Sequence, residues 1–324
     1  QAFSSIGGFL VAWMNGLAAE HANMFPAIHG GHEAWRYTLI SGVIPALPLL
    51  LIRPFLPESP EWQRKKESGQ LKRPSIAALF SPELRRTTLL TTLGFAASYG
   101  IAFGAIQQLP QILGAPKGGH NQVLAAGVAA QAKLKADYAA AGKPAPSERL
   151  LKVTAANASD AVVAKVTKFQ EAGGLVGRCL LAVVVLVFLS RRLQLTLFII
   201  PSLVFIPLYF HWLSGNLATD SLDMVKWGIF ITGLLTVAQF SFWGNYIPLV
   251  FPVHLRGTGE SFAANIGGRI IGTAAAWITI TLSESVPPNP AKIAVVGACV
   301  AGAYALVGAV LTWLLPEPKP EGEA

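Results

Sequence analysis

Residues 195–213 read LTLFIIPSLVFIPLYFHWL, nineteen residues without a single Lys, Arg, Asp or Glu. A bilayer core about 30 Å thick needs roughly 20 apolar residues in a helix. Pro201 and Pro207 would break a soluble helix, but neighbouring helices can satisfy the freed backbone groups within a membrane bundle. This segment therefore predicts a transmembrane helix in a protein whose solvent is lipid.

The composition of the whole 324-residue chain has the same character. Hydrophobic residues make up 52% and charged residues only 13%, whereas soluble domains carry about 25% charged residues. This argues against a soluble enzyme or a nucleic-acid partner, despite the net charge of +8. Cys179 and Cys299 have no metal-binding or disulfide spacing, and the spans contain no HExxH, no G-x-S-x-G and no Asp pair. We expect no metal, no cofactor and no enzymatic activity.

The same length criterion predicts eight membrane spans. They are Gln1–Ala19, Trp35–Leu56, Thr87–Leu113, Ala172–Leu189, Leu195–Leu213, Val225–Phe251, Gly257–Ser283 and Ala291–Leu315. Period-two alternation, which is typical of barrel strands, is absent. The predicted fold class is therefore an all-α multispanning membrane protein.

Lysine and arginine are distributed unevenly over the connecting segments. Alternating segments hold twelve on one side against three on the other, Arg36, Lys226 and Lys292. Cytoplasmic loops carry the excess of positive charge, so both ends of the chain are predicted to be cytoplasmic in a multi-pass protein of the cell membrane. The long segment 114–171 was left out of this count because of its length.

Segment 114–171 is the part that resembles a soluble protein. Gln122–Ala141 and Ser147–Glu171 have helical spacing, and residues 142–146, GKPAP, separate them. We expect an external helical hairpin, with two roles left open: a solvated spacer, or a lid or docking site for a partner. Asn157-Ala158-Ser159 fits a glycosylation sequon, a pattern too short to carry weight.

Three motifs resemble those of major facilitator superfamily transporters. Residues 55–62, FLPESPEW, with Trp35-Arg36-Tyr37 before them, resemble the sixth helix of that superfamily. Residues 251–259, FPVHLRGTG, continue to Gly267-Gly268-Arg269 and look like its loop between helices ten and eleven. Residues 315–318, LPEP, are similar to the ending of its sugar-porter branch, with Pro318 in place of Thr.

The resemblance implies that the chain runs from helix five to helix twelve of the superfamily bundle, so that eight of twelve helices are present. Gln1 is then interpreted as a truncated start rather than a signal peptide. The implied divisions are 1–56, the last two helices of the N-terminal half; 57–86, the cytoplasmic loop between halves; 87–113, helix seven; 114–171, the external insertion; 172–315, helices eight to twelve; and 316–324, a cytoplasmic tail.

Two arginines lie far from the ends of predicted spans, where a charge is costly and marks a functional hypothesis. Arg178 lies thirteen residues from Arg191, about 20 Å, and Arg269 lies twelve from Gly257, about 18 Å. Gln239 and Tyr99 fall at about the same depth by the same rise. Two guanidinium groups with such donors suit a carboxylate, which they bind bidentately. The alternative is that Arg178 extends to the interface and Arg269 packs on a backbone carbonyl.

Further candidates come from stripes of polar and aromatic residues. Asn265 shares a face with Arg269 because the two are four residues apart, and Trp243 follows Gln239 by the same spacing. Gln107 belongs to a glutamine pair similar to that of sugar porters, although the residues after it depart from that pattern. Each stripe also fits simple helix packing.

These observations predict a secondary active transporter that works by alternating access. We expect a monomer in the lipid bilayer that moves a small organic anion, a monocarboxylate or sugar acid, as a symporter with protons; the proton is implied by the resemblance alone. Glu58 and Arg256 mark cytoplasmic helix ends and are candidates for a gate, or for simple helix caps. The alternatives are a neutral sugar carrier, a drug efflux carrier, and a non-transporting sensor.

Overall fold

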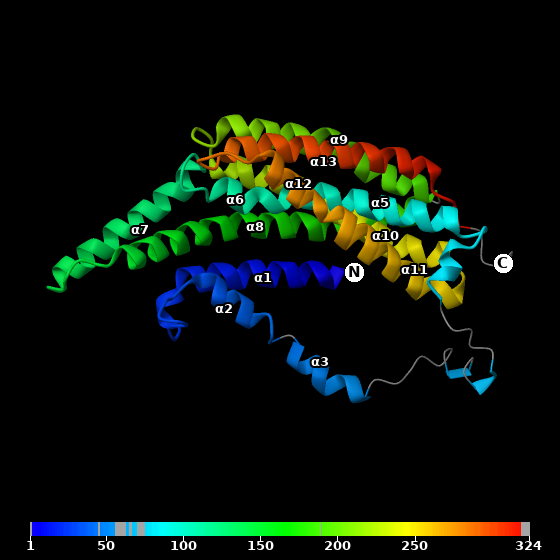
Figure 1. Cartoon of the computed structure of the whole chain (residues 1–324), viewed down its shortest axis with the longest axis horizontal. Helices are drawn as coiled ribbons and strands as arrows, with labels where there is room; N and C mark the ends of the chain where they lie inside the picture. The colour runs from blue at the N-terminus through cyan, green and yellow to red at the C-terminus, as the bar shows by residue number, and fades with distance from the viewer. Residues whose placement is uncertain are drawn as a thin grey trace.

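A computed structural model describes residues 2–44, 46–55, 63–64, 67–69, 75–188 and 190–318. Within these ranges the chain is helical, and the β-structure consists of one isolated bridge between Ile28 and Gly31. The long helices run alongside one another in an elongated bundle (Figure 1). The predicted all-α fold class is therefore confirmed.

The main helices are α1 (Ala2–Glu20), α2 (Ala34–Ser41), α3 (Ala46–Ile52), α5 (Arg85–Gly104), α6 (Leu109–Leu113), α7 (Asn121–Ala140), α8 (Glu148–Val187), α9 (Arg191–Asn216), α10 (Leu222–Val250), α11 (Arg256–Phe262), α12 (Ala274–Leu282) and α13 (Pro290–Leu314). The short 3-10 turns are η1 (Ala22–Met24), η2 (Arg53–Phe55), η3 (Ala77–Phe80), η4 (Ile106–Gln108) and η5 (Val253–Leu255). Between α11 and α12 lies η6 (Ala263–Gly272), which is π-helical.

Six helical stretches among the described residues are long and apolar enough to cross a membrane. They are Ala34–Phe55, Arg85–Leu113, Glu148–Val187, Arg191–Asn216, Leu222–Val250 and Pro290–Leu314. Each overlaps a predicted span. The first and seventh predicted spans are helical as well, as α1 and as α11–η6–α12. In the seventh, the π-helical stretch divides the run into three short elements, so no single element reaches the length of a span.

The second predicted span is interrupted. Its helix ends at Ser41, and α3 begins again only at Ala46. Gly42 and the nearby Pro48 disfavour an unbroken helix, because glycine adds backbone freedom and proline lacks a donor. In Figure 1, α3 points away from the bundle, and its side chains Leu50 and Leu51 are exposed.

Helix α8 is longer than predicted. It runs without a break for 40 residues, about 60 Å at 1.5 Å per residue, which is twice the thickness of a bilayer core. The second piece of the expected hairpin and the fourth expected span are thus one helix, and Ala172 marks no structural boundary. Helix α7 lies against its first half: Ser159 Oγ donates to Val123 O at 3.1 Å, and Gln131 Nε2 donates to Leu151 O at 3.1 Å.

Helices α8 and α10 touch backbone to backbone. A Cβ on Gly177 would collide with the carbonyl oxygen of Leu234 and lie 2.9 Å from its carbonyl carbon. A Cβ on Gly173 would collide with Phe230 O in the same way. Small residues permit such close approach of membrane helices. The two glycines therefore fix the distance between the helices that enclose the cavities described below.

The base of the α7–α8 hairpin is fastened to the loop between α9 and α10. Asn121 N donates to Leu217 O at 3.0 Å. His120 is fully buried, and its Nδ1 accepts from Gln122 N at the start of α7. Burial lowers the pKa of His120, and the Asp220 carboxylate only partly opposes that effect. The imidazole is therefore favoured in its neutral form.

The segment after α13 caps the start of α9. Glu317 accepts hydrogen bonds from Ser190 Oγ at 2.7 Å, from Arg191 N at 2.9 Å and from Arg192 N at 3.1 Å. Partial burial raises the pKa of this carboxyl, but these bonds and the charge of Arg192 outweigh it, so the net pKa is lowered. A carboxylate at a helix N-terminus also complements the helix dipole.

Candidate functional site

Two cavities share Arg178, a half-buried residue of α8. The smaller cavity, of about 150 Å³, is enclosed by η4, α5, α8 and α10; its lining is Ala102, Ile106, Gln107, Gln170, Glu171, Arg178, Gly233, Thr236, Val237 and Phe240. The larger cavity, of about 560 Å³, lies between α8 and α10; its lining is Arg178, Cys179, Leu181, Ala182, Val185, Ser241, Gly244 and Asn245. Arg178 thus lines both spaces.

Each cavity also has a buried hydroxyl group from α10. Thr236 lines the smaller cavity and is 1% exposed, and Ser241 lines the larger cavity and is 9% exposed. Neither hydroxyl oxygen has a hydrogen-bond partner within the described part of the chain. Buried polar atoms nearly always have a partner, so these two hydroxyls are suited to bind water or a polar solute.

Glu171 is the charged residue that the sequence analysis missed. It lies seven residues before Arg178 on α8, two turns along the same face, and its carboxylate interacts electrostatically with that guanidinium. Gln170 Nε2 donates to Glu171 Oε1 at 3.3 Å. The predicted span began at Ala172 and so left Glu171 in a loop. The seven-residue spacing of opposite charges was the signal that could have identified it.

Two of the predicted site residues meet Arg178. Gln107, in η4, lines the smaller cavity with it. Tyr99, on α5, interacts electrostatically with Arg178, and its ring packs against that of Phe240, with centroids 4.9 Å apart. Phe240 itself lines the smaller cavity. The structure therefore gathers Arg178, Gln107 and Tyr99 into one region.

Gln239 and Trp243 lie elsewhere, in a buried hydrogen-bond network that joins three helices. Trp243 Nε1 donates to Ser98 Oγ at 2.9 Å, and Ser98 Oγ donates to Gln239 Oε1 at 3.0 Å. Gln239 Nε2 donates to Ser202 Oγ at 2.8 Å. Both residues are at most 1% exposed, and neither lines the two cavities. Their polar groups connect α5, α9 and α10.

Arg269 and Asn265 form a separate exposed stripe on η6. Arg269 Nη1 donates to Asn265 Oδ1 at 3.2 Å, and Asn265 Nδ2 donates to Ser261 O at 2.8 Å. Gly267 and Gly272 instead face α5, where an added Cβ would collide with the helix. Neither Arg269 nor Asn265 lines the two cavities that contain Arg178. The two arginines are thus found in different surroundings.

Of the two gate candidates, Glu58 lies outside the described residues. Arg256 is exposed, and its Nε donates to Phe251 O at 3.4 Å, just after the end of α10. A cation near a helix C-terminus is favoured by the helix dipole. In this conformation Arg256 therefore acts as a helix cap.

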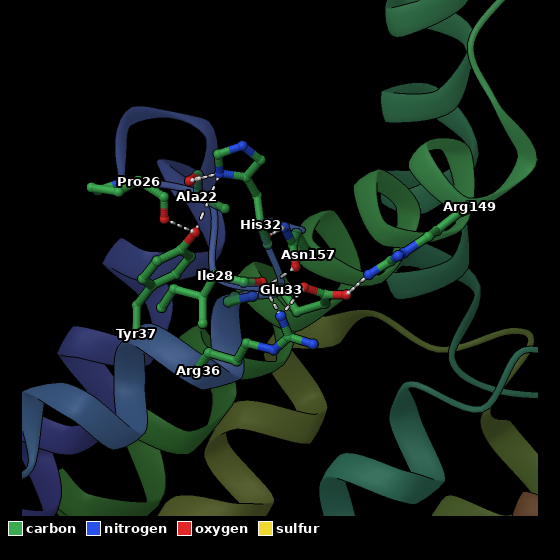
Figure 2. Close-up of polar contacts among 10 residues, drawn as sticks. Ala22, Pro26, Ile28, His32, Glu33, Arg36, Tyr37, Arg149 and Asn157 are labelled. Carbon is green, nitrogen blue, oxygen red and sulfur yellow. Dashed lines mark hydrogen bonds and ion pairs between the residues drawn. The ribbon is translucent and has the colours of Figure 1, made fainter. Parts of the chain in front are cut away.

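A cluster at the outer end of α8 ties the loop after α1 to the hairpin; we call Glu33, Arg36, Arg149 and Asn157 the outer clasp. Glu33 forms ion pairs with Arg36 and Arg149, each at 3.2 Å. In Figure 2, Arg149 reaches from α8 towards Glu33. A hydrogen bond from its own backbone N–H lowers the pKa of Glu33; partial desolvation opposes this, and Arg149 and Arg36 reinforce it.

Asn157 is the buried member of the outer clasp. Its Oδ1 accepts from Ala34 N at 3.2 Å, and its Nδ2 donates to His32 O at 2.9 Å (Figure 2). Asn157 is 9% exposed and both ends of its amide are hydrogen-bonded, so the folded chain does not present it as a glycan acceptor. The bonds hold the turn before α2 against α8.

Among the described residues, no group of three or more His, Cys, Asp or Glu side chains could hold a metal ion. The cavities around Arg178 are instead lined by one cation, one carboxylate, amides and hydroxyls. Such a set can bind a polar or anionic organic solute by hydrogen bonds and charge.

Comparison with known proteins gives one match. The family model for "Sugar (and other) transporter" matches residues 1–107, a stretch that contains Tyr99 and Gln107 but ends before Arg178. No curated protein and no solved structure matches the chain. The match covers about a third of the chain, and the helical bundle with its six candidate spans fits a multi-pass membrane protein.

Proposed function

We propose that the protein carries a small organic anion, a monocarboxylate or sugar acid, across the cell membrane by alternating access, in symport with protons. Arg178 binds the substrate carboxylate at the junction of the two cavities. The single observation that carries this proposal is that one half-buried arginine, Arg178, lines both spaces.

The chemistry of the cavities supports an anionic substrate. A guanidinium group presents a planar fork that matches a carboxylate, and charge-assisted bonds of this kind are about twice as strong as neutral ones. The larger cavity, at about 560 Å³, falls within the range of about 300–1,000 Å³ that small-molecule sites occupy. The Thr236 and Ser241 hydroxyls and the Asn245 amide supply further partners for a hydroxylated acid.

In this proposal the remaining predicted residues have secondary roles. Gln107 and Tyr99 lie beside Arg178 and help to form the binding site. Gln239 and Trp243 hold α5 and α10 together through their buried hydrogen bonds. Arg269 and Asn265 form a second polar surface on η6. A π-helical stretch often occurs at functional sites, so we retain this stripe as a candidate that meets the solute in another conformation.

The test measures uptake of radiolabelled lactate, gluconate and glucose by the full chain in proteoliposomes. Hydrogen bonds to charged groups contribute about 1.5–3 kcal/mol, so Arg178→Ala is expected to lower carboxylate uptake by roughly tenfold to a hundredfold. Arg178→Lys is expected to retain part of it, because the charge stays but the fork is lost. Arg86→Ala, at an exposed arginine in the first turn of α5, is the control and should leave uptake unchanged.

The second candidate function is transport of a neutral sugar. The amide and hydroxyl lining supplied by Gln107, Ser241 and Asn245 favours it, as does the description of the matched family. In that case the wild type accumulates glucose rather than lactate or gluconate. Arg178→Ala would then leave the transported sugar largely unaffected, and the anion proposal would be rejected.

A further inference from the structure

The outer clasp joins two parts of the chain that are far apart in sequence. Glu33 and Arg36 lie at the start of α2, whereas Arg149 and Asn157 lie on α8. The family model matches residues 1–107, so the clasp connects the matched stretch to a helix outside it. Alternating access requires the two halves of a carrier to rock against each other. In the proposed carrier α1 and α2 belong to the first half and α8 to the second, so this motion would strain the clasp.

A second ion pair lies beside the outer clasp. Lys165 Nζ of α8 lies 3.4 Å from Glu20 Oε1, at the end of α1. The ion pair between Glu33 and Arg149 and the two hydrogen bonds of Asn157 lie further out on the same helix (Figure 2). These polar contacts between α8 and the α1–α2 segment therefore gather at the outer end of α8.

The outer clasp adjoins a third cavity, of about 370 Å³, which we call the outer cavity. It lies between the end of α1, α7 and the first half of α8, and Asn157, Ala161 and Lys165 are among its lining residues. The buried apolar cluster at this seam consists of Ala18, Ala19, Ala22, Ala34, Tyr37 and Ala161. Alanine side chains bury little apolar area, so the polar contacts contribute much of the attachment between α8 and the α1–α2 segment here.

The arrangement of the charges makes this attachment reversible. Glu33 has one arginine partner on its own helix, Arg36, and one on α8, Arg149. If the two parts separate, Arg149 leaves and Arg36 remains, so the carboxylate keeps a partner. The Arg149 side chain is 62% exposed, and exposed ion pairs contribute little to stability. Asn157 is buried and would lose both of its hydrogen bonds at once, so this residue should contribute most to the closed arrangement.

We infer that the outer clasp is a gate that holds the outer end of the bundle closed, and that its release exposes the outer cavity to solvent. This inference rests on the alternating access of the proposed function, but not on the identity of the substrate. Release separates the turn before α2 from α8. Weakening the clasp should therefore raise the population of the open arrangement, while the cavities around Arg178 keep all their lining residues.

The experiment measures how often the outer cavity opens. Ala161 is 7% exposed, so Ala161→Cys places a thiol where a reagent reaches it mainly when the gate is open. The full chain, with Cys179 and Cys299 replaced by alanine, is placed in lipid nanodiscs and treated with a positively charged methanethiosulfonate reagent. Asn157→Ala should raise the rate of modification by about tenfold, because two buried hydrogen bonds are lost.

Arg149→Gln provides a second variant if Asn157→Ala does not fold, because its side chain is on the surface. It removes the ion pair to α8 and should raise the rate by up to about fivefold, as expected for an exposed pair. Arg149→Lys keeps the charge and should stay near the parent rate. The matched control is Ser159→Ala, which loses one hydrogen bond of α8, to Val123 O within the hairpin, and should leave the rate unchanged.

A distance measurement provides an independent readout. Spin labels at Met24, which is 80% exposed, and at the exposed Lys152 of α8 report the separation of the two parts. Pulsed electron paramagnetic resonance on the full chain should show a larger fraction of long distances in Asn157→Ala than in the parent protein. Ser159→Ala should show the same distribution as the parent.

The outcomes separate this inference from the proposed function. Equal modification rates and equal distances in the parent, Asn157→Ala and Arg149→Gln would reject the gate, even if the chain transports lactate. A rate in Ser159→Ala as high as in Asn157→Ala would also reject it, because the thiol would then report a loosened hairpin. If the clasp variants open the outer cavity but no lactate, gluconate or glucose is carried, the gate is supported and the proposed function fails.

Discussion

The contact between α8 and α10 predicts that Gly177→Ala changes both stability and transport. The added Cβ would overlap the Leu234 carbonyl oxygen and lie 2.9 Å from its carbon, whereas carbon atoms in ordinary contact are about 3.5–4.0 Å apart. The two helices must therefore separate by about 1 Å. Overpacking of this kind costs about 1–3 kcal/mol, against a gain of at most about 1 kcal/mol from replacing glycine in a helix.

The matched control is Gly215→Ala in α9, because an added Cβ there meets no atom within 4 Å. Thermal unfolding in detergent should show a lower midpoint for Gly177→Ala and an equal or higher midpoint for Gly215→Ala. Gly177 precedes Arg178 directly, and a misplacement of about 1 Å can cost about a hundredfold in rate. Lactate uptake should therefore fall in Gly177→Ala alone. Equal midpoints and equal uptake for the two variants would refute the close backbone contact.

Three further predictions concern the ends of the bundle. Asn157→Ala should lower the free energy of unfolding by about 2 kcal/mol, because it leaves His32 O and Ala34 N without their buried partner. Amide hydrogen exchange of residues 30–37 should accelerate. Unchanged exchange would contradict the role of the outer clasp. Glu317→Gln should lower the free energy of unfolding by only about 0.5–1 kcal/mol, since solvent screens this carboxylate. Because the folded-state pKa of Glu317 is lowered, its contribution is present above about pH 4.5 and is lost as the pH falls; unfolding midpoints at pH 7 and pH 4 should differ less in the variant. The pKa of His120 is lowered by a different cause: burial disfavours the charged imidazolium, so the unfolded chain binds the proton more tightly and stability falls as the pH drops below about 6.5. His120→Asn keeps a helix cap without a titratable ring and should remove that part of the pH dependence, and an undiminished dependence would exclude His120 as its source.

The sequence predicted the helical membrane class because that class depends on composition and spacing. A run without charges identifies a span whatever its neighbours are, and an arginine inside such a run is conspicuous. Depth within a span predicted Arg178 and Tyr99, and the resemblance to a sugar-porter glutamine pair predicted Gln107. The structure places these three near one another.

Other features depend on contacts with other helices, which the sequence of one helix does not reveal. The spacing of Gln239 and Trp243 defines a face, but Ser98 and Ser202, from two other helices, decide that this face is buried. The length of α8 was missed for a related reason. Hydropathy places the start of the fourth predicted span just after Glu171, because that residue is charged. The backbone hydrogen bonds of a helix continue through charged residues, and packing against α1 and α7 supports the first half of α8.

The π-helical stretch η6 was also not predicted from the sequence. Its glycines Gly267, Gly268 and Gly272 lie against α5. The change in helical pitch over residues 263–272, however, is a property of the backbone that residue type alone does not specify.

Because α8 is continuous, a tilt at one end of this helix is transmitted along its whole length. Glu148, at its outer tip, lies thirty residues from Arg178, about 45 Å along the axis, with no hinge between them. A tilt of only 5° would displace that tip by about 4 Å relative to the guanidinium, by the same rise per residue. A molecule that binds the hairpin would thus shift Arg178 and the two cavities that it lines. In the proposed carrier, an antibody raised against residues 121–160 is expected to trap one conformation.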